Sequence, residues 1–313
     1  MVLRMVRQLV RNYYFYKTMY YRRKIILSLL QVFDGELEKI QLQKLLFLFT
    51  RFQKDKKTYD FVPYKFGCYS FQANADLSTL KKYGIVSETT KSWKKEDEVN
   101  YLTELTKEDK KTISDFRIIY ANKTSDDLIN LTYKRYPYFA INSTVAKEYL
   151  TEEDFKNLDN YRSFEEDITL FTIGYQGITL EAYLNKLIKN NIKVLCDVRK
   201  NALSMKYGFS KSQLKNACNG VGIEYIHIPE VGIDSEQRQE LKTQTDYDVL
   251  FEEYKNLNLK KSINSQTEIL NILKKNRRIA LTCFEADICQ CHRKHLSEAI
   301  TNLKGFKYTL EHL

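Results

Sequence analysis

Side chains that can do chemistry gather in the carboxy-terminal half of the chain, each group directly after an apolar segment. Carboxylates and thiols are the usual proton carriers and nucleophiles of enzymes. The residues of these types that we expect to be catalytic are Asp197, Glu285 and Cys291. The neighbouring residues that we expect to bind a substrate are Gly174, Tyr175, Arg199, His227, Glu230, Cys283, His292 and Arg293.

The elements that must position these side chains alternate between two patterns. Short apolar segments typical of buried strands cover 168–173, 192–196, 222–228, 278–283 and, as a closing strand, 306–310. Helical patterns cover 179–189, 210–219, 246–257, 265–275 and 290–302. This alternation predicts an α/β fold with a mostly parallel sheet and helices on both faces. Because ligands of such sheets bind beyond the carboxyl ends of the strands, we expect the polar residues to form one site.

Asp197 and Arg199 allow two interpretations. They are two residues apart in an extended segment, so their side chains point to the same side. They could form an ion pair that orders the loop, or Asp197 could act as a base. Pairing with arginine would lower the pKa of the carboxylate and weaken it as a base. Arg199 and Arg293 together would suit an anion. The acidic Glu285 and Asp287 instead favour mixed recognition of a nucleobase or a nucleotide sugar.

A thiol at the start of a helix offers a different chemistry. Cys291, His292 and Arg293 begin the last long helical pattern, and a helix N-terminus and an adjacent arginine both lower the pKa of a thiol. Cys291 is therefore a candidate nucleophile, and the alternative is a buried thiol beside an arginine salt bridge. Cys283 stands at a strand end, as in rhodaneses and cysteine phosphatases. We do not expect that chemistry, because the following loop is acidic and too long.

Metal binding is not expected, although possible ligands are close together in the sequence. Five of them lie within thirteen residues: Cys283, Cys289, Cys291, His292 and His295. Structural zinc is usually held by two well-spaced pairs of ligands, and the spacing of Cys289 and Cys291 is tighter than usual. Cys291 and His292 are neighbours, which point apart on a helix. We therefore expect no metal and no cofactor.

The same segments closely resemble the family catalogued as domain of unknown function 488. The resemblance covers 168–305, and the residues that carry it are Thr172-Ile-Gly174-Tyr, Asp197-Val-Arg199, Phe209-Ser, Gly222-Ile-Glu-Tyr-Ile-His-Ile-Pro-Glu-Val-Gly232, Cys283-Phe-Glu-Ala-Asp287 and Cys291-His-Arg293. It implies no particular reaction. The chain departs from the family after Arg199, where a longer segment with proline is usual and Lys-Asn-Ala-Leu-Ser-Met stands here.

The amino-terminal half carries the whole positive charge of the protein. The formal net charge is +10, and residues 1–150 hold 27 Lys and Arg against 17 Asp and Glu, whereas residues 151–313 hold 23 of each. A basic module beside a neutral one suggests contact with DNA or RNA. A lysine-rich surface without a nucleic-acid partner is the alternative.

The order of elements in this half is that of a winged helix-turn-helix. Two helices within 20–53 are separated by Asp34-Gly35, a third covers 71–83, and a strand, a polar loop and a returning strand follow. Two further helices are expected at 107–120 and 125–136. The wing would be 87–98, and its residues expected to bind nucleic acid are Lys91, Trp93, Lys94 and Lys95.

Residues 25–135 resemble the Panacea (SocA-like antitoxin) superfamily. The segments that carry the resemblance include Leu42-Gln-Lys-Leu-Leu-Phe-Leu-Phe49 and Phe61-Val-Pro-Tyr-Lys-Phe-Gly-Cys-Tyr-Ser70. The resemblance implies a helical regulatory or antitoxin-type module whose role is binding, not catalysis.

We expect three parts: a basic, mainly helical domain over 1–150, a helical connector over 151–167, and the α/β domain over 168–313. No run of about 18 apolar residues exists, so we expect no membrane partner. The six cysteines show no disulfide pattern and no secretion signal is apparent, which favours the cytoplasm. The sequence leaves the oligomeric state open.

The function that these features favour is that of a nucleic-acid-associated enzyme. It would act on a base, sugar or nucleotide as a hydrolase or in the manner of a glycosylase, and bacterial defence is one context for it. Two alternatives stay open. The first is an antitoxin-like regulator or ligand sensor without enzymatic activity, and the second is a thiol-dependent enzyme.

Overall fold

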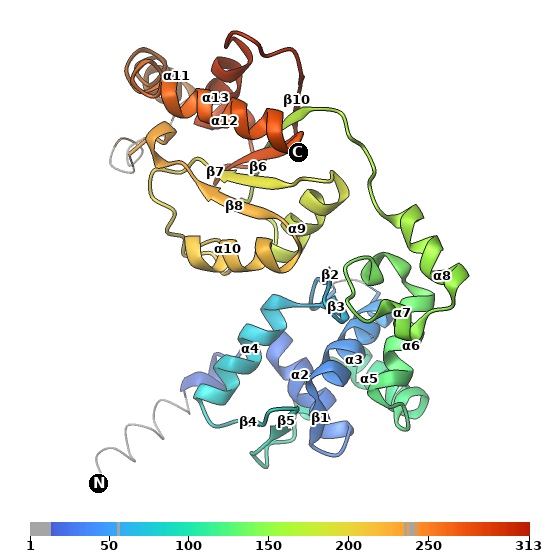
Figure 1. Ribbon diagram of the computed structural model, residues 1–313. Helices are drawn as coiled ribbons and strands as arrows, with labels where there is room; N and C mark the ends of the chain where they lie inside the picture. Colours follow the sequence, from blue (N-terminus) through green and yellow to red (C-terminus); the bar gives the residue numbers. More distant parts are fainter. Residues whose placement is uncertain (1–13, 55–56, 235–236, 238–240, 242) are drawn as a thin grey trace. The chain divides into compact units, whose positions relative to one another are not determined.

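The chain divides into two compact units, with the boundary between Asp159 and Asn160. The computed structural model describes residues 14–54, 57–234, 237, 241 and 243–313 (Figure 1). Within these ranges, no helix combines the length and the apolar character needed to cross a membrane. The two units are described separately below.

The amino-terminal unit is mainly helical and contains two small antiparallel sheets, one of three strands and one of two. Its elements in chain order are α2 (Tyr21–Val32), β1 (Glu36–Glu38), α3 (Lys39–Phe52), β2 (Val62–Tyr64), β3 (Gly67–Tyr69), α4 (Phe71–Lys82), β4 (Val86–Glu88), β5 (Ser92–Lys95), η1 (Tyr101–Glu104), α5 (Lys107–Tyr120), α6 (Ser125–Arg135), η2 (Pro137–Ala140), α7 (Ala146–Tyr149), α8 (Glu152–Asn157) and η3 (Leu158–Tyr161).

Apolar stripes and turn residues explain most of this unit. The stripes on α2 and α3 are buried in one core, and Asp34 and Gly35 separate the helices with positive φ angles of 63° and 84°. Of the two strands expected on either side of the wing, the first is β4, but the returning strand expected over 99–103 is wrong, because the 3-10 helix η1 lies there. The second strand of the hairpin is instead β5, inside the expected wing of 87–98, and β4 and β5 pair with β1 in the order β1-β5-β4. The sequence did not predict β1, nor the β2–β3 hairpin inside a segment expected to be a loop.

The carboxy-terminal unit is built on five strands. Its elements are β6 (Thr169–Gly174), α9 (Leu180–Lys189), β7 (Val194–Asp197), α10 (Lys211–Gly220), β8 (Glu224–His227), η4 (Pro229–Val231), α11 (Gln244–Glu253), the π-helical η6 (Tyr254–Leu259), α12 (Ile263–Asn276), β9 (Arg278–Cys283), η7 (Ile288–Gln290), α13 (His292–Thr301) and β10 (Thr309–His312).

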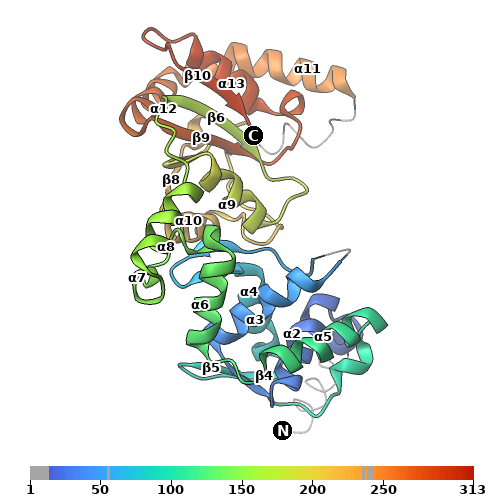
Figure 2. The same ribbon diagram turned by 90° about the vertical axis from the view of Figure 1, so that its right-hand side faces the viewer.

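These strands form one fully parallel sheet in the order β10-β6-β9-β7-β8. Every residue of β6, β7 and β9 is buried, as expected for strands covered on both faces. Helices α9 and α10 lie on one face and α11, α12 and α13 on the other (Figures 1 and 2). The predicted α/β architecture of this half is therefore confirmed.

The winding of the sheet reverses at β9. The chain moves outward from β6 to β7 and β8 through α9 and α10 on one face. It then returns through α11 and α12 on the opposite face to insert β9 between β6 and β7. Ligands of open parallel sheets bind where the connections of adjacent strands leave to opposite faces. The carboxyl end of β9 meets this condition toward both of its neighbours, because β6 and β7 continue to α9 and α10 on one face, whereas β9 continues to α13 on the other.

Two sequence expectations need correction. The connector at 151–167 is helical only through α8 and η3, and no regular element follows until β6. The helix was expected because the segment contains no proline and no glycine, but this alone does not stabilise a helix. None of the residues of α8 is fully buried, so little packing supports it. The closing strand lies at Thr309–His312, slightly beyond the expected 306–310.

Candidate functional site

Polar residues from four segments meet at the carboxyl edge of the parallel sheet. Cys283, the last residue of β9, is in register with Gly174 at the end of β6. On the other side of β9, Asp197 at the end of β7 is in register with Thr282, and His227 of β8 is in register with Asp197. Residues distant in the sequence thus lie beside one another at the point where the winding reverses.

A cavity of about 270 Å³ lies at this edge. Three of the predicted site residues line it, namely Tyr175, Arg199 and Cys283. The other lining residues come mainly from the loop after β7, and they are Lys200, Asn201, Leu203, Ser204, Met205, Ile233 and Phe284. The loop that departs from the family pattern therefore forms much of the cavity wall.

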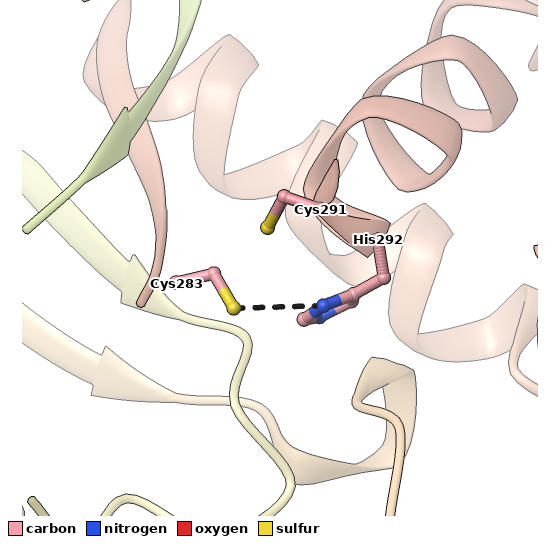
Figure 3. Close-up of side chains that lie close together, drawn as sticks. All are labelled: Cys283, Cys291 and His292. Carbon is pink, nitrogen blue, oxygen red and sulfur yellow. Dashed lines mark hydrogen bonds between the residues drawn. The ribbon is translucent and has the colours of Figure 1, made fainter. Parts of the chain in front are cut away.

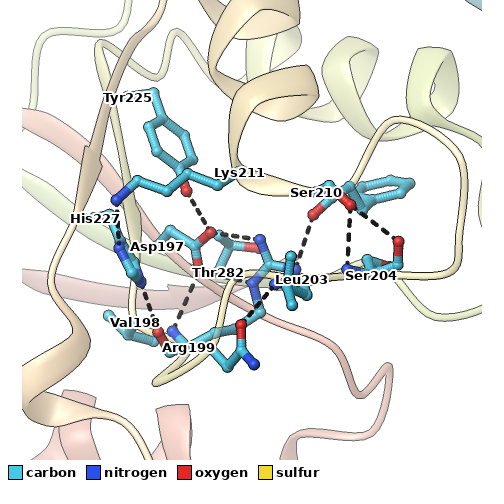
Figure 4. A network of polar contacts seen from close by, with 12 residues as sticks. Asp197, Val198, Arg199, Leu203, Ser204, Ser210, Lys211, Tyr225, His227 and Thr282 are labelled. Carbon is cyan, nitrogen blue, oxygen red and sulfur yellow. Dashed lines mark hydrogen bonds and ion pairs between the residues drawn. The ribbon is translucent and has the colours of Figure 1, made fainter.

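Asp197 and Arg199 form a buried ion pair (Figure 4). The Asp197 Oδ1 accepts hydrogen bonds from the backbone N–H of Arg199 at 3.2 Å and from its Nε at 2.8 Å. The Oδ2 accepts from Nη2 of Arg199 and from the Tyr225 hydroxyl at 2.6 Å. Burial opposes the charge on Arg199, but its hydrogen bonds to Asp197 outweigh burial and raise its pKa above the usual value.

This arrangement gives Asp197 a positioning role. Both carboxylate oxygens accept two hydrogen bonds each, and the residue is fully buried. Both oxygens of this carboxylate are therefore directed at protein donors. Of the two interpretations of the Asp197–Arg199 pair, the ion pair that orders the loop describes this geometry.

Arg199 also fixes the aromatic floor of the cavity. Its Nη1 donates to the Tyr175 hydroxyl at 2.7 Å and to the Phe209 carbonyl oxygen at 2.9 Å. The rings of Tyr175 and Phe209 are stacked, with centroids 4.2 Å apart, and Phe284 meets Tyr175 edge to face. The guanidinium group is thus occupied by protein partners, so the cavity cation with fewer constraints is the exposed Lys200.

His227 contacts the network, whereas Glu230 is exposed, and neither residue lines the cavity. The His227 Nε2 lies 2.9 Å from the Arg199 carbonyl oxygen, and its Nδ1 lies 3.0 Å from Nζ of Lys211. These contacts place the proton on Nε2, because a carbonyl only accepts and an ammonium only donates. Glu230 is exposed within η4. Neither residue is among those that line the cavity.

Cys283, Cys291 and His292 converge between the end of β9 and the start of α13 (Figure 3). Their ligand atoms all lie within 4.8 Å of one another, and the Cys283 Sγ is 3.6 Å from Nδ1 of His292. All three residues are buried. The Nε2 of His292 faces the Val198 carbonyl oxygen at 3.1 Å, which leaves Nδ1 as the acceptor toward sulfur.

This convergence corrects two expectations about Cys291. The residue precedes α13 as its N-cap, with φ of −131° and ψ of 133°, so its side chain does not follow helical spacing. Cys291 and His292 therefore face the same space instead of pointing apart. Burial, reinforced by Cys283, raises the pKa of the Cys291 thiol well above the usual value. The expected lowering of this pKa by the helix N-terminus and Arg293 is therefore outweighed by burial.

Arg293 and Gly174 shape the loop after β9. The Arg293 guanidinium donates to the backbone carbonyl oxygens of Glu285 and Ala286, the latter at 3.1 Å. A side chain at Gly174 would meet the Glu285 carbonyl oxygen at 1.8 Å. The Glu285 carboxylate turns to Cys283, whose Sγ lies 3.1 Å from Oε2. The Nε of Arg293 is buried and has no hydrogen-bond partner among the described residues, and binding of an anion by Arg199 and Arg293 stays a prediction.

In the amino-terminal unit, the expected nucleic-acid residues divide into two pairs. Lys91 and Lys94 are exposed. Trp93 is only 3% exposed and belongs to the hydrophobic core, so it cannot stack on a base. Lys95 is held by Asp97 at 2.8 Å. The alternation of a strand, which turns successive residues to opposite faces, accounts for Trp93 pointing inward and Lys94 outward.

One family model covers most of the carboxy-terminal unit. Residues 179–300 match the family described as Domain of unknown function DUF488. This DUF488-like region runs from α9 to α13 and contains the ion pair and the Cys283, Cys291 and His292 cluster. It begins after Gly174 and Tyr175 and is narrower than the resemblance over 168–305. No curated protein and no solved structure matched the chain.

Several residues of the DUF488-like region were missed by sequence reasoning. Tyr225 and Phe209 hold the ion pair, and the Val198 carbonyl oxygen orients His292. Tyr225 and Phe209 stand inside motifs that were recognised, where their apolar rings suggested only core packing. The alternation of β8 could have placed Tyr225 on one face with the side chain of His227, because the two are two residues apart.

Proposed function

We propose that this protein is a nucleic-acid-associated enzyme that acts on a base, sugar or nucleotide in the cavity at the carboxyl edge of its parallel sheet. The observation that carries the proposal is the place of that cavity. It lies where the winding reverses and is lined by Tyr175, Lys200 and Cys283, among others. Stacking rings, a cation and a reactive side chain together suit a small polar aromatic ligand.

The size of the cavity supports a small group as the reacting part. A volume of about 270 Å³ is at the lower end for ligand sites, so a nucleobase or a sugar fits better than a longer segment of chain. The openings toward solvent are bordered by Leu203 and Met205, both strongly exposed. A nucleotide of a larger nucleic acid could enter past these side chains.

The amino-terminal unit supports the nucleic-acid part of the proposal. We interpret α2, α3, α4 and the β1-β5-β4 sheet as a winged helix, in which α4 would be the recognition helix and β4–β5 the wing, with the β2–β3 hairpin added between α3 and α4. Lys82 at the end of α4 and Lys91 and Lys94 on the wing are exposed. Together with the charge excess of residues 1–150, these lysines favour contact with phosphates.

The test is to close the cavity without disturbing the core. Leu203 lines the cavity and is 75% exposed, so Leu203→Trp should fill the opening at little cost in stability. The matched control is Val249→Trp, at a residue that is 65% exposed and does not line the cavity. Both variants and the wild type are incubated with nucleosides, nucleotides and short DNA and RNA, and products are identified by mass spectrometry.

We expect a product with the wild type and Val249→Trp, and at least a tenfold loss of turnover with Leu203→Trp, because each 1.4 kcal/mol of lost interaction is about tenfold. Ligand binding without any product would contradict the enzyme and support a sensor. Equal turnover in Leu203→Trp would exclude this cavity as the active site.

A thiol-dependent enzyme is the second candidate, favoured by one specific observation. Cys283 is among the residues that line the cavity, and its Sγ lies 3.6 Å from the Nδ1 of His292, a base that could activate it. If Cys283 is the nucleophile, iodoacetamide should alkylate its thiol and abolish turnover, and bound substrate should slow this loss. Unchanged turnover in Cys283→Ser would exclude this candidate.

A further inference from the structure

Two sulfur atoms and one imidazole nitrogen meet in a buried space between the end of β9 and the start of α13. Their mutual distances are all below 4.8 Å. On a tetrahedral zinc ion, bond lengths of about 2.3 Å to sulfur and 2.0 Å to nitrogen place two ligand atoms about 3.5–3.8 Å apart. The 3.6 Å between the Cys283 Sγ and the His292 Nδ1 already has this value. The remaining sulfur, that of Cys291, needs to approach by at most about 1 Å.

The orientation of His292 is the one that a metal ligand needs. Histidines that bind metals usually donate their other ring N–H to a carbonyl or carboxylate, which fixes the tautomer and the direction of the ring. The Nε2 of His292 faces the Val198 carbonyl oxygen at 3.1 Å. Val198 stands between Asp197 and Arg199, so the buried ion pair holds this second contact in place.

Glu285 lies beside the cluster but is not one of its members. Its Oε2 lies 3.1 Å from the Cys283 Sγ, while Cys283 also lines the cavity. Three protein ligands with a carboxylate or water as the fourth is the composition of catalytic zinc sites, whereas four Cys and His ligands are typical of structural ones. Two thiolates and a neutral imidazole also select soft metals over magnesium or calcium.

We propose that Cys283, Cys291 and His292 bind a zinc ion, with water as the fourth ligand and the Glu285 carboxylate beside Cys283. Binding releases the two thiol protons to solvent and leaves a neutral group of two thiolates and Zn²⁺ in the buried space. The ion would present a water to the cavity and so make the proposed enzyme a metal-dependent hydrolase. This catalytic role rests on the proposed function, but the binding itself does not.

The test measures metal on the full chain without any substrate. Purified, reduced protein is dialysed against Zn²⁺, and bound zinc is determined by elemental mass spectrometry. Co²⁺ is used in parallel, because thiolate ligands give it an intense charge-transfer absorption. The ligand variants are Cys291→Ser and His292→Asn. The matched controls are Cys289→Ser and His295→Asn, which change an exposed cysteine and a partly buried histidine close to the ligands in the chain.

We expect equimolar zinc and a thiolate–cobalt band in the wild type and both controls, and a loss of affinity of at least about tenfold in both ligand variants. If the ligand variants do not fold, the wild type alone tests the site. A thiolate–cobalt band and a rise of its melting temperature with Zn²⁺ would support the site, and the absence of both would overturn it. No zinc uptake by reduced wild type would overturn the site, as would retention by both ligand variants. A Cys283–Cys291 disulfide in protein purified without reductant, together with no metal uptake after reduction, would replace it with a redox pair.

Zinc uptake without turnover would leave the metal site intact and count only against the enzyme. Turnover by protein that holds no zinc would support the enzyme and count only against the catalytic role of the metal. The two proposals can therefore fail separately.

Discussion

At the scale of single residues, Asp197 and Arg199 form the buried ion pair of the candidate site. Both are buried, and each depends on the other for the compensation of its charge. Removing one partner of a buried pair leaves the other charge without compensation, which costs far more than the pair itself contributes. The pair also fixes Tyr175 and the Val198 carbonyl oxygen, so its effect extends to the cavity and to His292.

Asp197→Asn should lower the free energy of unfolding by about 3–5 kcal/mol, because it keeps the shape and removes the charge that balances Arg199. Urea denaturation, followed for the carboxy-terminal unit, measures the change. The control is Glu88→Gln, which breaks a surface pair with Lys39 and should cost at most about 1 kcal/mol. Equal costs for the two variants would show that the Asp197 charge is not needed.

At the scale of elements, Gly174 shows how the end of β6 and the loop after β9 depend on each other. A Cβ at this position would lie 1.8 Å from the Glu285 carbonyl oxygen, which is backbone and cannot turn away. Only a residue without a side chain allows the two segments to approach so closely. The carboxylate of Glu285 is brought to Cys283 by that approach.

Gly174→Ala should therefore displace the loop after β9 and lower stability by about 1–3 kcal/mol, the usual cost of forcing atoms into a packed site. Gly177→Ala is the control, because Gly177 has a positive φ of 80° but open space around it. Thermal unfolding compares the two. A smaller effect at Gly174 than at Gly177 would mean that the loop can move freely.

The elements also show how far the sequence could predict the site. Apolar periodicity located β6, β7, β8 and β9, and the polar residues that follow them do lie at one edge of the sheet. The meeting of Cys291 and His292 was missed because it depends on where α13 begins, and a helix start is uncertain by a residue or more from sequence. Trp93 was assigned to a surface for a similar reason, since a polar segment concealed the inward face of β5.

The order of the strands was also beyond the sequence. Nothing in the individual segments states that β9 inserts between β6 and β7, because that choice is made by packing of whole helices against the two faces. The sequence therefore placed the site residues at strand ends without showing which of them are neighbours. It could not show that Arg199 and Arg293 bind protein groups, because hydrogen-bond partners depend on the loops.

At the scale of the whole molecule, the charge of residues 1–150 gives a direct test of nucleic-acid binding. Lys91→Glu combined with Lys94→Glu should weaken binding of double-stranded DNA or RNA at least about tenfold. It should also reduce the slope of log affinity against log salt by about 1 for each lysine that contacts a phosphate. Fluorescence anisotropy at several salt concentrations measures both quantities.

The control for this experiment is the same charge change in the neutral half. Lys274 and Lys275 are exposed at the end of α12, so Lys274→Glu with Lys275→Glu changes the net charge equally. Equal losses in both double variants would mean that only the total charge matters. Full binding by the wing variant would remove Lys91 and Lys94 from the interface.

The position of β9 in the sheet has a consequence for folding of the protein during its synthesis on the ribosome. The neighbours of β6 are β9 and β10, and both are translated after it. Until they emerge, β6 is an apolar strand with two unpaired edges, while β7 and β8 can already pair. Such segments form late and are exposed to aggregation. The nascent chain thus has to protect Thr169–Gly174 through most of the synthesis of its own domain.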